Sequence, residues 1–205
     1  MLILAVDTSM PLFSVALVSG ERLIGAYAAE GKSSRNEKLL PAIDWLLAEG
    51  GIERGAIDRL AVTRGPGSFT GVRIGLATIQ GLAFALERPI AAISTHEAAL
   101  GEAPPREALV FSDAGREEFY ASGFRDGIEA LEPALVTAAQ LELLRGEYGA
   151  AIDVDRLIRR ENLALRAARR VQALAAGGGE LPCDATPIYV RLAEAEIRLL
   201  RKGDA

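Results

Sequence analysis

An internal repeat constrains the fold of this chain more than any other sequence feature. The segment from Leu109 to Gly115 resembles the segment from Leu2 to Thr8, and each is an apolar run that ends at an aspartate. Two further strand-like segments, separated by short turns, follow each run. We therefore expect two copies of one unit that begins with three antiparallel strands, one in residues 1–103 and a smaller, eroded one in residues 106–205.

Helical patterns alternate with short strands after the first three strands. Apolar residues from Leu39 to Leu47 keep helical spacing, with Ser34 as the expected N-cap and Glu37 completing a capping box. The pattern predicts a mixed α/β protein. Its other predicted elements are a strand at 60–63, a helix at 71–86, a strand at 90–93, helices at 137–144 and 162–176, an extended segment at 186–191 and a helical end at 192–202.

Charge and composition exclude several classes of protein. The chain has 28 acidic and 23 basic residues and a net charge of −5, so we expect no strong nucleic-acid binding by the chain alone. The single cysteine, Cys183, and the single histidine, His96, are too few for a disulfide or for an all-Cys/His zinc site. We expect no signal peptide in the apolar opening, and no membrane span in the run at 72–86, which Arg73 and Gln80 interrupt. A reducing compartment, the cytosol, fits best.

A glycine-rich loop from Arg64 to Gly71 lies between a predicted strand and a predicted helix. Glycines allow a ligand to approach the backbone closely, and the free amides at a helix start favour an anion such as phosphate. A tight structural turn explains the same glycines, and the loop has neither the Walker lysine nor the G-x-G-x-x-G spacing. Both interpretations stay open at this stage.

Aspartates end the first strand of each repeat. A carboxylate at such a place can hold hydrated magnesium, and two facing turns could clamp a nucleotide, although an aspartate there is as often a turn former. The residues of a vestigial nucleotide site would be Asp7, Thr8, Gly65, Gly67, Ser68 and Asp113.

The other polar residues favour structural roles. His96 is expected at a helix start or in the core, and neither Ser68 nor Ser94 has the spacing of a catalytic triad. The basic stretch from Arg156 to Arg170 could contact RNA phosphates, but a solvated helix face is favoured because acidic residues are interspersed. We therefore predict no catalytic residue and no metal ligand.

The two helices of the first repeat could form an apolar docking surface, because small residues at helical spacing let another helix approach closely. The helix that approaches these small residues could belong to this chain or to a partner. The residues predicted to bind a partner are Leu39, Leu40, Ile43, Leu47, Phe69, Gly71, Val72, Gly75, Thr78, Ile79, Leu82 and Ala85.

Four motifs together resemble the TsaB (YeaZ) family over nearly the whole chain. They are Ile3 to Ser9, Leu39-Leu40-Pro41, the run Arg64-Gly65-Pro66-Gly67-Ser68-Phe69-Thr70-Gly71-Val72-Arg73-Ile74-Gly75, and Pro187 to Arg191. The resemblance implies two ribonuclease-H-like lobes of the actin-like ATPase (ASKHA) type.

The same resemblance implies a cytoplasmic, noncatalytic relative of TsaD without a cofactor. Such a protein is expected to pair with TsaD through helices of its first lobe, to be joined by the ATPase TsaE, to form a homodimer when alone, and to meet tRNA only through the complex. TsaD transfers a threonylcarbamoyl group to adenosine beside the tRNA anticodon. The alternative is a small actin-like phosphotransferase or ATPase that uses Asp7, Asp113 and the loop from Gly65 to Gly71.

Overall fold

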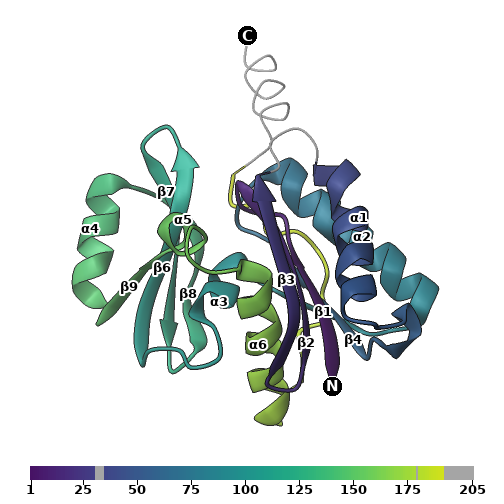
Figure 1. Ribbon diagram of the computed structural model, residues 1–205. Coiled ribbons are helices and arrows are strands. Elements are labelled where there is room, and N and C mark those ends of the chain that lie inside the picture. The colour runs from purple at the N-terminus through teal and green to yellow at the C-terminus, as the bar shows by residue number, and fades with distance from the viewer. Residues whose placement is uncertain (31–34, 179, 192–205) are drawn as a thin grey trace.

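The first lobe is built on a five-stranded sheet in the order β3-β2-β1-β4-β5. This computed structural model describes residues 1–30, 35–178 and 180–191 (Figure 1). The strands β1, β2 and β3 form an antiparallel meander, and β4 and β5 run parallel to β1. Their bounds are β1 (Leu2–Asp7), β2 (Leu12–Ser19), β3 (Arg22–Glu30), β4 (Arg59–Thr63) and β5 (Ile90–Ile93).

The second lobe repeats this arrangement with a four-stranded sheet in the order β8-β7-β6-β9. The strand β6 pairs antiparallel with β7 and parallel with β9, as β1 pairs with β2 and β4. The predicted repeat is confirmed, and the second sheet lacks the counterpart of β5. The bounds are β6 (Glu107–Gly115), β7 (Glu118–Arg125), β8 (Ile128–Thr137) and β9 (Ala150–Asp153).

Helices cover both faces of the first sheet and the outer face of the second (Figure 1). Because strand side chains alternate in direction, Leu4 and Val6 pack against α1 and α2 on one side, while Ile3 and Ala5 pack against α6 on the other. The helices are α1 (Arg35–Glu49), the 3-10 turn η1 (Arg54–Ala56), α2 (Phe69–Leu86), α3 (Thr95–Leu100), α4 (Ala138–Glu147), α5 (Val154–Leu157) and α6 (Leu163–Ala176).

The helix α6 joins the two lobes. It follows the second sheet in the chain, yet it packs on β1 and β2 of the first sheet. The same apolar cluster contains Ala108, Val110 and Phe124 of the second sheet. The strands of the first sheet end before residue 104 and those of the second begin after it, but α6 packs on the first sheet. The lobe limits 1–103 and 106–205 therefore remain a prediction.

Several helix and strand boundaries differ from the sequence predictions. The helix α2 begins at Phe69, two residues before the predicted start, because the Ser68 hydroxyl accepts a hydrogen bond from the Gly71 amide and caps the helix. The short elements α3, β9 and α5 were not predicted. The proposed Ser34 cap and the helix predicted at 192–202 lie outside the described residues.

The helix α2 has unusual composition for a surface helix. Among the described helices it alone is long and apolar enough to cross a membrane, with a mean hydropathy of 1.4 over its 18 residues and 33% of the segment buried. The sequence-based exclusion of a span considered only residues 72–86. A core helix of a globular protein passes the same test of length and composition, and α2 packs its buried side on β1 and β4.

Candidate functional site

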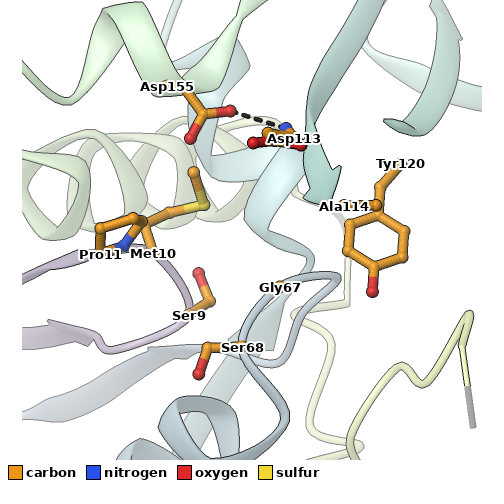
Figure 2. A pocket seen from close by; sticks show the side chains of 9 residues that line it. All are labelled: Ser9, Met10, Pro11, Gly67, Ser68, Asp113, Ala114, Tyr120 and Asp155. Carbon is orange, nitrogen blue, oxygen red and sulfur yellow. Dashed lines mark hydrogen bonds between the residues drawn. The ribbon is translucent and has the colours of Figure 1, made fainter. Parts of the chain in front are cut away.

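A cavity of about 460 Å³ lies between the two lobes, where β1 and β6 end. Figure 2 shows Ser9 and Ser68 on the first-lobe side, opposite Asp113 and Asp155 of the second lobe. The cavity brings three of the predicted nucleotide contacts together: Gly67, Ser68 and Asp113. The other three, Asp7, Thr8 and Gly65, are not among its lining residues, which are Ser9, Met10, Pro11, Gly67, Ser68, Asp113, Ala114, Tyr120 and Asp155.

The Asp7 side chain organises the turn after β1 and is fully buried. Its Oδ1 accepts hydrogen bonds from the Ser9 amide at 3.1 Å and from the hydroxyls of Ser9 and Thr63, each at 2.5 Å. These bonds fix the turn against β4. The carboxylate therefore has a structural task whether or not the cavity binds a ligand.

The glycines of the loop make room for this chain's own atoms. A Cβ at Gly65, where φ is +99°, would lie 2.8 Å from the carbonyl oxygen of Ile188. A Cβ at Gly67 would collide with the Ser9 carbonyl, and one at Gly75 would collide with the Thr8 hydroxyl. A close approach of the backbone was the expected reason for these glycines, and the approaching groups in this structure are internal.

The second-lobe side of the cavity is acidic. The Asp113 amide donates a hydrogen bond to Asp155 Oδ2 at 2.7 Å (Figure 2). Asp113 Oδ1 accepts a hydrogen bond from the Gly115 amide at 2.7 Å. Burial raises the pKa of Asp155, and the neighbouring Asp153 and Asp113 carboxylates add to this, while the bond from the Asp113 amide and Arg159 oppose it. The lining contains two carboxylates and no lysine or arginine. The cavity therefore favours a cation, and a nucleotide phosphate would need to bring magnesium with it.

The described residues contain no cluster of three or more His, Cys, Asp or Glu side chains that could hold a metal ion. With two carboxylates, the cavity wall could contact the water shell of a hydrated Mg²⁺, which retains several of its waters in proteins.

His96 lies at the start of α3 and is completely buried, as expected for a core histidine. Its Nδ1 is 2.8 Å from the Ser122 hydroxyl and its Nε2 is 3.1 Å from the Ser112 hydroxyl. Burial lowers the pKa of His96 to about 3, so the ring is neutral at pH 7. Both serines are also buried, and the two ring nitrogens face serine hydroxyls rather than a carboxylate, so the cluster does not have the geometry of a hydrolase triad.

Most of the predicted partner-binding residues lie in the chain's own core. Their apolar face packs on the first sheet, because the apolar side of an amphipathic helix covers the core to which it belongs. The buried residues of this set are Leu39, Ile43, Leu47, Gly71, Val72, Gly75 and Ile79. Those with exposed or partly exposed surface are Leu40, Phe69, Thr78, Leu82 and Ala85.

The exposed apolar surface of the two helices includes residues that were not predicted. Phe84 is 88% exposed on α2, and Trp45 is 51% exposed on α1, where it packs edge-on against Tyr27 of β3. Ala77 and Gly81 are exposed beside Phe84 on α2. We name Ala77, Gly81, Phe84 and Ala85 the α2 stripe. An apolar residue that breaks the amphipathic pattern was the sequence signal for Phe84.

The basic stretch is largely neutralised within the chain. Arg166 pairs with Glu161 at 2.6 Å, Arg169 with Glu102 at 3.1 Å, and Arg156 with Asp153 at 3.2 Å. Arg170 departs from the expected solvated face, since only 6% of the residue is exposed.

Comparison with known proteins identifies the family. A family model described as "TsaD: tRNA N6-adenosine threonylcarbamoyltransferase" matches residues 30–176. The solved structure of YeaZ from Pseudomonas aeruginosa superposes with a TM-score of 0.67 at 28% identity, covering 92% of this chain and 99% of that one. TsaB of Haemophilus influenzae is 44% identical over 93 residues, which are 45% of this chain and 39% of that protein. The chain belongs to the TsaB (YeaZ) family.

Two other relatives show how far this similarity extends. TsaB of Escherichia coli is 40% identical over 95 residues, 46% of this chain and 41% of that protein. An uncharacterized protein of Mycobacterium tuberculosis is 30% identical over 142 residues, 68% of this chain and 67% of that protein. The matched segments thus span about two fifths of the curated TsaB proteins. The expected duplicated, two-lobed α/β fold is confirmed, and the family is one named for tRNA threonylcarbamoyladenosine biosynthesis.

Proposed function

We propose that this chain is a noncatalytic scaffold subunit that binds a TsaD-type transferase and supports transfer of the threonylcarbamoyl group to adenosine beside the tRNA anticodon. The α2 stripe is the observation that carries the proposal. It places an 88% exposed phenylalanine on a helix apolar enough to span a membrane, and water is a poor environment for such a surface.

The geometry of the stripe suits a second helix. Ala77, Gly81 and Phe84 are spaced by four and three residues, which places them on one side of α2. The small residues let a facing helix approach closely, and Phe84 supplies a side chain whose burial contributes about 1.5–3 kcal/mol. Aromatic residues of this kind dominate the energy of many interfaces.

Leu40 of α1, which is 46% exposed, adds apolar surface on the helix that contacts α2. A partner of the same superfamily would offer a corresponding helix pair. In the absence of that partner, a second copy of this chain would offer the same surface through a twofold axis. We accordingly propose a homodimer for the isolated protein, a TsaE-like ATPase as a further subunit, and a cytoplasmic location.

The proposal assigns tRNA contact to the complex rather than to this chain. The net charge is −5, and carboxylates already pair with Arg156, Arg166 and Arg169 of the basic stretch. Phosphate contacts depend on an excess of unneutralised positive charge.

Threonylcarbamoyladenosine formation on tRNA tests this function. The cognate partner enzymes are assayed with the chain present, omitted, or replaced by Phe84→Glu or by the control Leu143→Glu. Leu143 is 73% exposed on α4 of the other lobe. We expect modification to require the chain, to fall at least about tenfold with Phe84→Glu, and to persist with Leu143→Glu. Unchanged modification when the chain is omitted would overturn the proposal.

The cavity keeps the phosphotransferase or ATPase as a second candidate, since it does bring Gly67, Ser68 and Asp113 together. Calorimetry with ATP and magnesium separates the two functions, because an ATPase of this type binds its nucleotide at micromolar to millimolar concentrations. We expect no binding at 1 mM. Binding that disappears in an Asp113→Asn variant, accompanied by ATP hydrolysis, would favour the second candidate.

A further inference from the structure

The segment of residues 181–191, here named the strap, lies along the first lobe without forming a helix or a strand. The Ala92 amide of β5 donates a hydrogen bond to the Pro182 carbonyl at 2.8 Å, so the strap begins on the outer edge of the first sheet. Further along, the Ile188 amide donates to the Arg64 carbonyl at 2.7 Å. The Ile188 carbonyl fills the space that the missing Cβ of Gly65 leaves free.

Side chains anchor the middle of the strap. The Arg64 guanidinium donates to Asp184 Oδ2 at 3.0 Å and to the Thr186 carbonyl at 3.4 Å. The Thr186 amide and hydroxyl donate in turn to Asp184 Oδ1 at 3.1 and 2.7 Å. These bonds from Thr186 hold the pKa of Asp184 below its usual value, and they give the strap a defined turn.

Near its end the strap reaches α2. The Arg73 Nε donates a hydrogen bond to the Tyr189 hydroxyl at 2.6 Å, and the Tyr189 ring lies 4.7 Å from the Phe69 ring. The Arg73 guanidinium lies 3.9 Å above the Phe69 ring, a cation–π geometry. Arg73 is one helical turn before Ala77, so this stack borders the α2 stripe, and Tyr189 is itself 41% exposed.

The last described residue of the strap crosses to the second lobe. The Arg191 guanidinium donates to the Ala114 carbonyl at 2.9 Å and forms an ion pair with Glu118. Ala114 also lines the cavity between the lobes. The strap therefore joins the lobes beside the cavity, in addition to the apolar core around α6 that both lobes share.

We propose that the strap sets the width of the cleft between the lobes, with Arg191 as the latch on the second lobe, and that a protein docking on the α2 stripe moves the second lobe through Tyr189. The second part rests on the proposed function. The strap can open without unfolding either lobe, because its hydrogen bonds and ion pairs lie near the surface and it forms no regular secondary structure.

Hydrogen exchange on the isolated full chain tests the strap without any partner. In Arg191→Ala we expect the peptide covering residues 113–120 to exchange about fivefold faster than in the unaltered chain, while α6 stays protected. Arg125→Ala is the matched control, because Arg125 pairs at 3.5 Å with Glu107 of the same lobe. Equal exchange in Arg191→Ala and Arg125→Ala would overturn the latch.

A variant in which the charges of Arg191 and Glu118 are swapped separates the effect of the ion pair from any general loss of stability. The double variant Arg191→Glu with Glu118→Arg should restore part of the slow exchange of residues 113–120, because the ion pair returns while the hydrogen bond to the Ala114 carbonyl does not, whereas each single variant should restore none. Failure of the double variant to recover protection, when both single variants have lost it, would also count against an Arg191–Glu118 latch.

Adding the purified transferase tests the link to docking, with binding measured separately by calorimetry. We expect exchange at residues 113–120 to change on binding in the unaltered chain, and to change much less in Tyr189→Ala. Binding without any change at 113–120 overturns the link and leaves the proposed function standing. Absence of binding overturns the proposed function, while the exchange of Arg191→Ala still decides the latch.

Discussion

Replacement of His96 should remove a large part of the acid sensitivity of this protein. Burial lowers the pKa of His96 from 6.5 to about 3, and the ring lies between the Ser112 and Ser122 hydroxyls. Below pH 6.5 the unfolded chain binds a proton at this position that the folded chain does not. The stability that the neutral His96 ring contributes is therefore fully present above pH 6.5 and is lost as the pH falls toward about 3.

The two pKa values set the magnitude. Between pH 7 and pH 4.5 the unfolded state gains about 2.5 kcal/mol relative to the folded state from this one proton. Carboxylates also titrate in this range. Among them is Glu97: burial raises its pKa, and the nearby Arg170 opposes this rise. They contribute equally to a variant that differs only at residue 96, so the difference between the two proteins isolates the histidine.

The assay is urea unfolding of the unaltered chain and of His96→Gln at half-unit steps of pH. Glutamine can still bond to a serine hydroxyl but does not titrate, so His96→Gln can be less stable at pH 7 and yet lose less stability on acidification. We expect the gap in unfolding free energy to shrink by about 2.5 kcal/mol between pH 7 and pH 4.5. A gap that stays constant over this range would refute the assignment of a strongly lowered pKa.

Two further predictions concern the contact of Gly65 with the strap and the ion pair between Arg170 and Glu97. Gly65→Ala should destabilise the fold by about 2–3 kcal/mol, because it combines a φ of +99° with a Cβ placed 2.8 Å from the Ile188 carbonyl oxygen. The control Gly20→Ala, at a φ of +54° with open space around it, should cost about 1 kcal/mol. Thermal unfolding of both variants compares the two losses, and equal losses would argue against the strap contact. Arg170→Met should lower the free energy of unfolding by about 3 kcal/mol, because it leaves the largely buried Glu97 without its cationic partner. Adding Glu97→Met should recover much of this loss, measured by urea unfolding at pH 7. Additive losses in the double variant would contradict the prediction.

Most strands of this fold were predictable because local patterns determine them. Apolar runs between turn residues located β1 and β2, and their repetition located β6 and β7. The short element α3 had a usable signal, since Ser94 caps it and Glu97 follows three residues later. The four-residue strand β9 had none, because its pairing with β6 comes from tertiary contact and not from a local pattern.

The sequence predicted a docking surface on α1 and α2 from residues that mostly lie on the buried side of these helices. Helical spacing identifies which residues share a face, and the apolar face of α1 and α2 is the one that covers the first sheet. Leu39 and Ile79 are therefore core residues, while Phe84 and Trp45 interrupt the polar side. Apolar residues that break an amphipathic pattern point to a surface more directly than those that complete it.

The glycine-rich loop illustrates how the same sequence pattern supports two functions. Glycine reports that something approaches the backbone closely, but the pattern does not say whether that group is a phosphate or another part of the chain. Here Gly65 accommodates the Ile188 carbonyl and Gly67 accommodates the Ser9 carbonyl. The loop thereby ties the strap to the start of α2, the helix whose exposed stripe is the proposed docking surface. On this reasoning the loop serves α2 and its partner even if the cavity beside it never binds a nucleotide.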